Sequence, residues 1–141
     1  SIGILKPPPV LDSSAWKRCL LLGRVPFVHA SLLAERSLIL KAGGYPAFKK
    51  AEDYLFLLRI LHYTSLITIP EPLYTIRRKE LTLKKYRTSN FYNVLGNIKF
   101  IQEKNLPLWL YLSISIPLAK AFLPIPINLL ERIRWKRFGL Q

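Results

Sequence analysis

Residues 42–59 of the chain read Ala-Gly-Gly-Tyr-Pro-Ala-Phe-Lys-Lys-Ala-Glu-Asp-Tyr-Leu-Phe-Leu-Leu-Arg. The paired glycines Gly43 and Gly44 permit backbone conformations closed to other residues and let a ligand approach closely. The acidic pair Glu52 and Asp53 comes directly before apolar residues at helical spacing, so we expect a helix over 52–63. The stretch therefore predicts a glycine-rich loop that leads into an apolar helix with two carboxylates in its first turn.

The acidic pair has two interpretations. Glu52 and Asp53 can be ordinary acidic residues at a helix N-terminus, where the positive end of the helix dipole favours them. One of the two carboxylates can instead act as a general base at the lip of a cleft. A similar choice applies to His29, which is either a satisfied histidine of the core or sheet edge or part of a binding pocket.

The residues around the acidic pair occur in a characteristic order. The ordered series comprises Phe27-Val28-His29-Ala30-Ser31, Glu35-Arg36, Leu40, Gly43-Gly44-Tyr45, Glu52-Asp53-Tyr54, Leu57-Leu58-Arg59 and Ile69-Pro70-Glu71-Pro72-Leu73-Tyr74-Thr75-Ile76-Arg77. Over residues 20–82 this series resembles the C-terminal half of family 2 glycosyltransferases, which have the GT-A fold. No single piece of the series is specific, but its order is.

The resemblance implies a fold. We expect an α/β architecture, namely the C-terminal half of a GT-A (Rossmann-like) nucleotide-sugar transferase fold followed by an α-helical tail. Alternating segments support it: helices from residue 14 to 22, over 35–42 and over 52–63, with strands over 25–33, 66–69 and 73–78. The expected divisions are an acceptor-side part (1–88), an amphipathic helix capped by Ser89 and Asn90 (89–105), and an apolar and basic interfacial tail (106–141).

The resemblance also implies an activity, the inverting transfer of a sugar from a nucleotide-sugar donor to a hydroxyl acceptor in polysaccharide, O-antigen or glycolipid synthesis. Asp53 would take the proton of the acceptor hydroxyl, and Glu52 would orient the loop or an acceptor hydroxyl. The Gly43-Gly44-Tyr45 loop would line the sugar, and His29 would lie in the acceptor pocket. Arg77 would help to stabilise the departing diphosphate.

Metal use is tied to the N-terminal half of such enzymes. That half carries the nucleotide-binding strands and an Asp-x-Asp motif, so Mg²⁺ or Mn²⁺ would bind there and not to this segment, which has no Cys/His metal cluster. Many GT-A enzymes place a metal-binding histidine where this chain has Lys79, which could pair with the diphosphate directly. We therefore expect the chain to be a segment of a longer polypeptide, inactive by itself, whose upstream region encodes the donor half.

Charge is distributed unevenly. Of the 22 Lys and Arg residues 13 lie in residues 77–141, together with only 3 of the 8 acidic residues. Residues 106–137 combine short apolar runs, aromatic residues and prolines with a terminal basic cluster, and Lys120 interrupts the longest run, which is shorter than a membrane span. This pattern favours helices lying on an anionic membrane surface. We expect a peripheral protein on the cytoplasmic face with a sugar or lipid-linked acceptor; the single cysteine fits a reducing compartment.

A function of another class, binding without catalysis, would explain the charge but not the ordered series of residues. The chain could be a non-catalytic basic module that binds anionic membrane or nucleic acid through Arg77-Arg78-Lys79 and Lys84-Lys85-Tyr86-Arg87. No nucleic-acid-binding fold signature is present in the sequence, so we expect no nucleic-acid partner.

Overall fold

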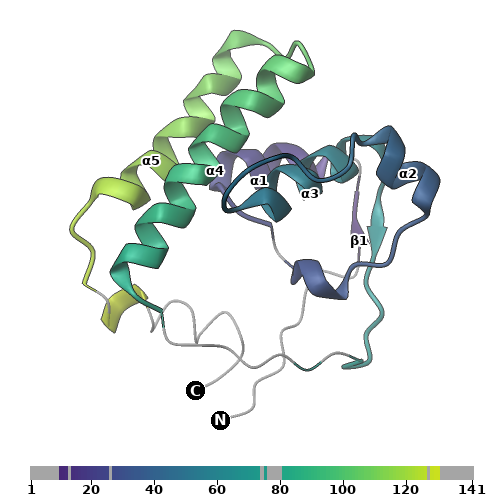
Figure 1. Cartoon of the computed structure of the whole chain (residues 1–141), viewed down its shortest axis with the longest axis horizontal. Coiled ribbons are helices and arrows are strands. Elements are labelled where there is room, and N and C mark those ends of the chain that lie inside the picture. The colour runs from purple at the N-terminus through teal and green to yellow at the C-terminus, as the bar shows by residue number, and fades with distance from the viewer. Residues whose placement is uncertain are drawn as a thin grey trace.

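A computed structural model describes residues 10–12, 14–25, 27–73, 75, 81–126 and 128–130. The elements follow one another as β1 (Val10–Leu11), α1 (Ala15–Leu22), η1 (His29–Ser31), α2 (Arg36–Lys41), α3 (Glu52–Tyr63), β2 (Leu66–Ile67), α4 (Leu83–Glu103), η2 (Leu108–Ile114) and α5 (Ser115–Phe122). Helices make up most of this part of the chain, and α4, the longest of the described helices, stands side by side with α5 (Figure 1).

The expected Rossmann-like α/β architecture is wrong. In the described residues the only sheet joins β1 to β2, which run antiparallel with Val10 opposite Ile67 and Leu11 opposite Leu66. A GT-A sheet needs several mainly parallel strands with helices packed on its faces. The core here forms between helices instead, so the described part of the chain is an α-helical assembly with one short β-ladder.

The β-forming segment 25–33 shows why the expectation failed. His29–Ser31 is a single 3₁₀ turn, closed by hydrogen bonds from the Ser31 and Leu32 backbone N–H groups. Val25 and Phe27 pack against the buried side chains of α3 rather than into a sheet. Without a partner strand, β-propensity reflects a preference for half-buried surfaces, and a helix surface satisfies it.

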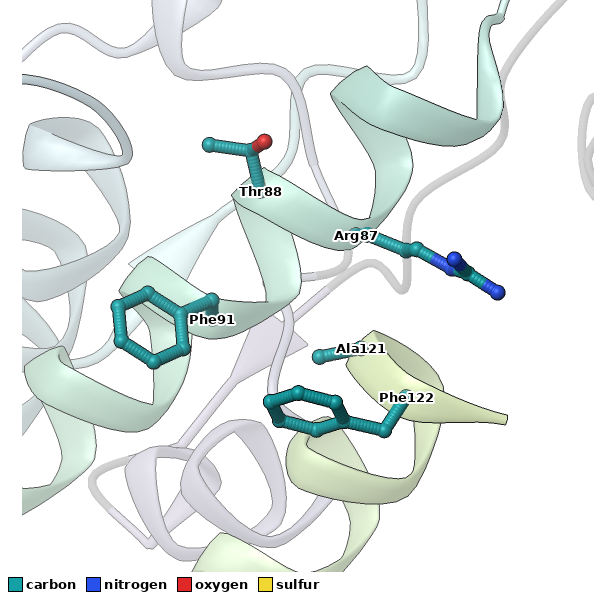
Figure 2. Close-up of a pocket in the computed structure, with 5 residues that line it drawn as sticks. All are labelled: Arg87, Thr88, Phe91, Ala121 and Phe122. Carbon is teal, nitrogen blue, oxygen red and sulfur yellow. The ribbon is translucent and has the colours of Figure 1, made fainter. Parts of the chain in front are cut away.

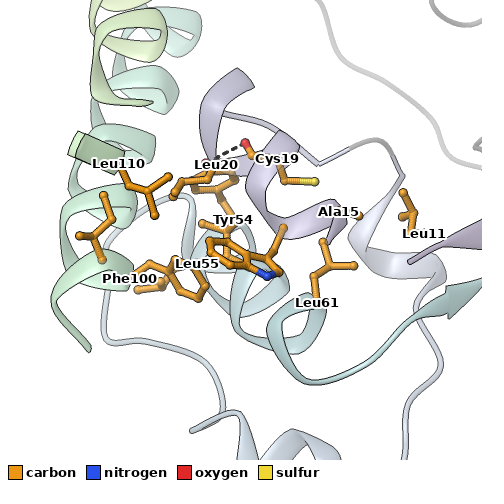
Figure 3. Close-up of a cluster of buried hydrophobic side chains, with 12 residues drawn as sticks. Leu11, Ala15, Cys19, Leu20, Tyr54, Leu55, Leu61, Phe100 and Leu110 are labelled. Carbon is orange, nitrogen blue, oxygen red and sulfur yellow. Dashed lines mark hydrogen bonds between the residues drawn. The ribbon is translucent and has the colours of Figure 1, made fainter. Parts of the chain in front are cut away.

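Helix α3 forms the centre of the core and has the bounds that the sequence predicts. Its residues Tyr54–Leu61 are all buried, as expected for a helix that is apolar all round. One face packs with α1, α4 and η2 around Leu20, Phe100 and Leu110 (Figure 3). The other face, through Phe56, Leu57 and Ile60, packs with residues of α2 and the segment before it. Helix α3 therefore holds the two halves of the described structure together.

Buried asparagines of helix α4 form hydrogen bonds to carbonyl groups at the C-terminal end of α1. Asn93 Nδ2 donates to the Gly23 carbonyl at 2.8 Å, and Asn97 Nδ2 donates to the Leu20 carbonyl at 3.0 Å. The last carbonyls of a helix have no partner within it, so these amides satisfy groups that burial would otherwise penalise. The helix begins at Leu83, with Thr82 accepting from the Lys85 N–H, and not at Ser89 as the sequence indicated.

The segment after α4 turns back along it. Helix α5 packs against α4 and touches α1, and Lys120 Nζ donates to the Leu22 carbonyl at 2.6 Å. Gly23 and Pro117 meet so closely that a Cβ on Gly23 would lie 2.8 Å from that of Pro117. One side of the segment 108–122, which carries Leu110, Ser113, Pro117 and Ala121, is thus buried in the helical core. Within the described ranges, no helix has the length and apolar character needed to cross a membrane.

Candidate functional site

The loop that follows α2 is shaped by its glycines. Gly43 and Gly44 have φ values of 82° and 60°, which side-chain-bearing residues rarely adopt. The Gly44 N–H reaches back to the Ile39 carbonyl at 3.0 Å and the Gly43 N–H to the Leu40 carbonyl at 3.0 Å. This closure ends α2 and turns the chain toward α3, in agreement with the predicted glycine-rich loop.

The guanidinium of Arg59 in α3 forms hydrogen bonds to the same loop. Its Nη1 donates to the Gly44 carbonyl at 3.1 Å and lies 3.5 Å from the Gly43 carbonyl oxygen. Its Nε and Nη2 donate to the two carboxylate oxygens of Glu103 at 3.0 and 2.7 Å. Only 9% of the Arg59 side chain is exposed, so these partners satisfy a cation inside the core. The loop is thereby tied to the end of α4.

The side chain of Tyr45 contacts two other aromatic side chains, Phe56 and His29. Its ring stacks on the buried ring of Phe56, with centroids 4.1 Å apart and planes 19° from parallel. Its hydroxyl and His29 Nε2 form a hydrogen bond, and the two rings meet edge to face at 5.4 Å. Tyr45 is nevertheless 53% exposed. One face of an immobilised aromatic ring therefore remains open, at the point where η1, the loop and α3 meet.

The acidic pair begins α3 as predicted. Asp53 is half-buried, and its Oδ1 accepts from the Tyr54 N–H at 2.9 Å, whereas Glu52 is exposed. Residues three positions apart share a helix face, so Asp53 projects from the face of α3 that carries Phe56. Ala51, just before the pair, has a φ of 54°, an uncommon conformation for alanine that sets the direction in which α3 begins.

The structure thus brings some of the sequence-predicted residues together. His29, Gly43, Gly44 and Tyr45 form one connected group, joined to α3 through Phe56 and Arg59. No hydrogen bond links Asp53 or Glu52 to that group. The predicted Arg77 and Lys79, and the basic cluster after residue 130, lie outside the described residues. Among the described residues, no three His, Cys, Asp or Glu side chains gather closely enough to hold a metal ion.

Sequence reasoning gave no role to two residues that the structure emphasises. Arg59 lies inside an apolar helical run. Because a buried charge needs buried hydrogen-bonding partners, its position in the sequence indicates that it is paired. Phe56 was part of the same apolar run and gave no signal of its own. It supports Tyr45 only because the loop folds back over α3.

Comparison with family models, curated proteins and solved structures finds no match to this chain. The site must therefore be interpreted from its own geometry together with the sequence resemblance.

Proposed function

We propose that this chain supplies the acceptor side of an inverting sugar transferase that uses a nucleotide-sugar donor. The α/β architecture is no part of this role, since the described residues form a helical assembly and the role rests on the chemistry of the site. In this proposal a part of the protein N-terminal to Ser1 binds the donor, along with any Mg²⁺ or Mn²⁺ that the reaction needs.

The observation that carries the proposal is the stacking of Tyr45 on Phe56, which follows Asp53 by one turn of α3. Phe56 supports one face of the Tyr45 ring and His29 holds its hydroxyl, so the ring can offer its open face to a sugar at little entropic cost. Asp53 lies one turn from Phe56 on the same helix face. A stacking surface, a carboxylate and a glycine loop that lets substrate approach closely are features suited to holding a sugar acceptor.

In the proposed reaction, the acceptor hydroxyl attacks the anomeric carbon of the donor sugar. A bond forms between the acceptor oxygen and that carbon as the bond to the nucleoside diphosphate breaks, and the carboxylate of Asp53 takes the hydroxyl proton. The electron pair of the broken bond leaves with the diphosphate. A general base of this kind accelerates a reaction by about 10²–10⁴-fold.

The test is nucleoside diphosphate release by the full-length protein. A panel of nucleotide sugars would be offered with saccharide and lipid-linked acceptors, with and without Mg²⁺ or Mn²⁺. We expect acceptor-dependent release with at least one donor, and Tyr45→Ala should raise KM for the acceptor more than it lowers kcat. Failure of every donor to give acceptor-dependent release would contradict the proposal.

We further propose that this reaction takes place at a membrane surface. Helices η2 and α5, together with the residue that follows α5, expose a series of large apolar side chains, here called the apolar ridge. The apolar ridge consists of Leu108, Trp109, Leu112, Ile116, Phe122 and Leu123. Leu108, Leu112 and Phe122 are 82%, 72% and 67% exposed. Exposed apolar side chains in such a row suit partial burial in an interface, and the net charge of +14 favours an anionic one.

A further inference from the structure

A groove runs between α4 and α5 and holds about 430 Å³. Arg87, Thr88 and Phe91 line it from α4, while Ala121 and Phe122 line it from α5. Figure 2 shows Phe91 on α4 and Phe122 on α5, with the Arg87 side chain extending away from Phe91. The groove thus has a cationic end and an aromatic end.

The cationic end offers hydrogen bonds that the described part of the protein does not use. Arg87 is half-buried, and its Nε is screened from solvent without a hydrogen-bond partner among the described residues. Lys84 lies one turn earlier on the same helix face and is exposed, as is its neighbour Lys85. Thr88 Oγ1 donates to the Lys84 carbonyl at 2.8 Å, so its proton is already engaged. Because Nε is screened, an anion at this end would be held by the outer Nη1 and Nη2 groups of the guanidinium, with Lys84 one helical turn away.

The aromatic end leads directly to the apolar ridge. Phe91 is 44% exposed and Phe122 is 67% exposed, although both belong to helices that pack against each other. Phe122 lines the groove and is also a member of the apolar ridge. The aromatic end is thus continuous with the surface proposed to face a membrane. A free inorganic phosphate would leave this end uncovered, whereas a lipid would cover both ends.

We propose that the groove binds a single anionic phospholipid from the bilayer. Its phosphate lies on Arg87, with Lys84 nearby, and the first carbons of an acyl chain lie between Phe91 and Phe122. This inference rests on the proposed membrane placement and adds to it a lipid class and a defined binding site. It does not depend on the sugar-transfer chemistry at Asp53.

The test is partition of the full chain between buffer and vesicles at physiological salt. One set of vesicles is phosphatidylcholine alone, and the other contains about one fifth phosphatidic acid. We expect tighter binding to the second set, and Arg87→Gln should weaken that binding about five-fold, the effect of one cation beside anionic lipid. Phe122→Ser should weaken it several-fold.

Two controls separate the site from general charge and from misfolding. Arg36→Gln removes the same charge from α2, on the far side of the structure from α5 (Figure 1), and should change binding less than two-fold. Arg87→Lys keeps a cation and should restore most of the binding. Far-UV circular dichroism of each variant verifies the helix content.

Three outcomes would overturn the inference. Equal losses from Arg87→Gln and Arg36→Gln would mean that only net charge matters. The protein could also bind pure phosphatidylcholine as tightly as the vesicles with phosphatidic acid, with no effect of Arg87→Gln. The apolar ridge would then still contact the membrane, but the groove would not bind a lipid. Full competition by inorganic phosphate, with no dependence on Phe122, would make the site a plain anion site.

Discussion

Arg59 of α3 and Glu103 at the end of α4 form a two-point ion pair, while the same guanidinium donates to the carbonyl of Gly44. The two residues are 44 positions apart in the sequence. Their pairing makes the position of the Gly43-Gly44-Tyr45 loop depend on the end of α4. The loop that carries the open Tyr45 ring is therefore supported by the core.

We expect Glu103→Gln and Arg59→Gln to destabilise the protein by unequal amounts. Glu103→Gln should lower the free energy of unfolding by about 1–2 kcal/mol, because Glu103 is 30% exposed and water can replace part of the lost interaction. Arg59→Gln should lower it by more, because the bond to Gly44 is lost as well and Glu103 is left unpaired. Denaturant unfolding of both variants and the double variant gives the coupling, expected at about 1 kcal/mol or more. Strictly additive losses would contradict the pairing.

A second prediction concerns the buried hydroxyl of Tyr54. It donates to Asn97 Oδ1 at 2.6 Å, between α3 and α4. Tyr54→Phe leaves that oxygen buried without its donor and should lower the free energy of unfolding by about 1–3 kcal/mol. The matched control is Tyr63→Phe, whose hydroxyl accepts from Lys104 at the surface and whose loss should cost about 0.5 kcal/mol or less. Equal effects of the two substitutions would show that the buried bond adds nothing.

A third prediction tests whether α5 is part of the core. Gly23 and Gly44 have nearly equal φ values, 62° and 60°, but only Gly23 has a close neighbour, Pro117 of α5. Gly44→Ala should lower the free energy of unfolding by about 1–2 kcal/mol through backbone strain alone. Gly23→Ala should cost about 1–3 kcal/mol more, because its new Cβ would collide with Pro117. Similar losses in calorimetric or denaturant unfolding would mean that α5 is not held against α1.

A fourth prediction concerns His62, whose ring lies edge-on to Trp16 and Phe100. Burial, and then the charge of Lys104, lower the pKa of His62 from its usual 6.5. The unfolded chain keeps the usual pKa, so it binds a proton first as the pH falls. The contribution to stability is thus complete above about pH 6.5 and declines as the pH drops toward the folded pKa. As the pH falls over this range, the free energy of unfolding of His62→Gln should decrease less than that of the wild type. Identical dependence of the two free energies on pH would contradict a lowered pKa of His62.

The local features of the fold were predictable where the chain itself determines them. Helix α3 has the predicted bounds because its apolar run starts after an acidic pair and ends before Thr64. Helix α1 ends at Gly23 in a left-handed conformation, as its sequence indicates. These signals act within one or two helical turns, which is the range over which periodicity and capping operate.

The arrangement of the elements could not be obtained in this way. Segment 25–33 has the composition of a strand, but among the described residues no strand pairs with it, and Val25, Phe27 and Leu32 pack against buried side chains of α3 instead. Asn93 and Asn97 occupy the buried face of α4 for a reason that appears only when α1 presents its free carbonyls to them. The Tyr45–Phe56 stack likewise depends on how the loop returns over α3. Each of these contacts joins segments distant in sequence, which local patterns do not encode.

The most direct test of the proposed chemistry is the turnover number of the full-length protein with Asp53→Asn beside Glu52→Gln. Both substitutions remove one charge from the first turn of α3 and keep the shape of the side chain, so each controls for the other. We expect Asp53→Asn to lower kcat by about 10²–10⁴-fold with little change in donor binding, and Glu52→Gln to keep at least about a tenth of the rate. A variant with Asp53→Asn that retains more than about a tenth of the wild-type kcat would show that Asp53 is not the general base.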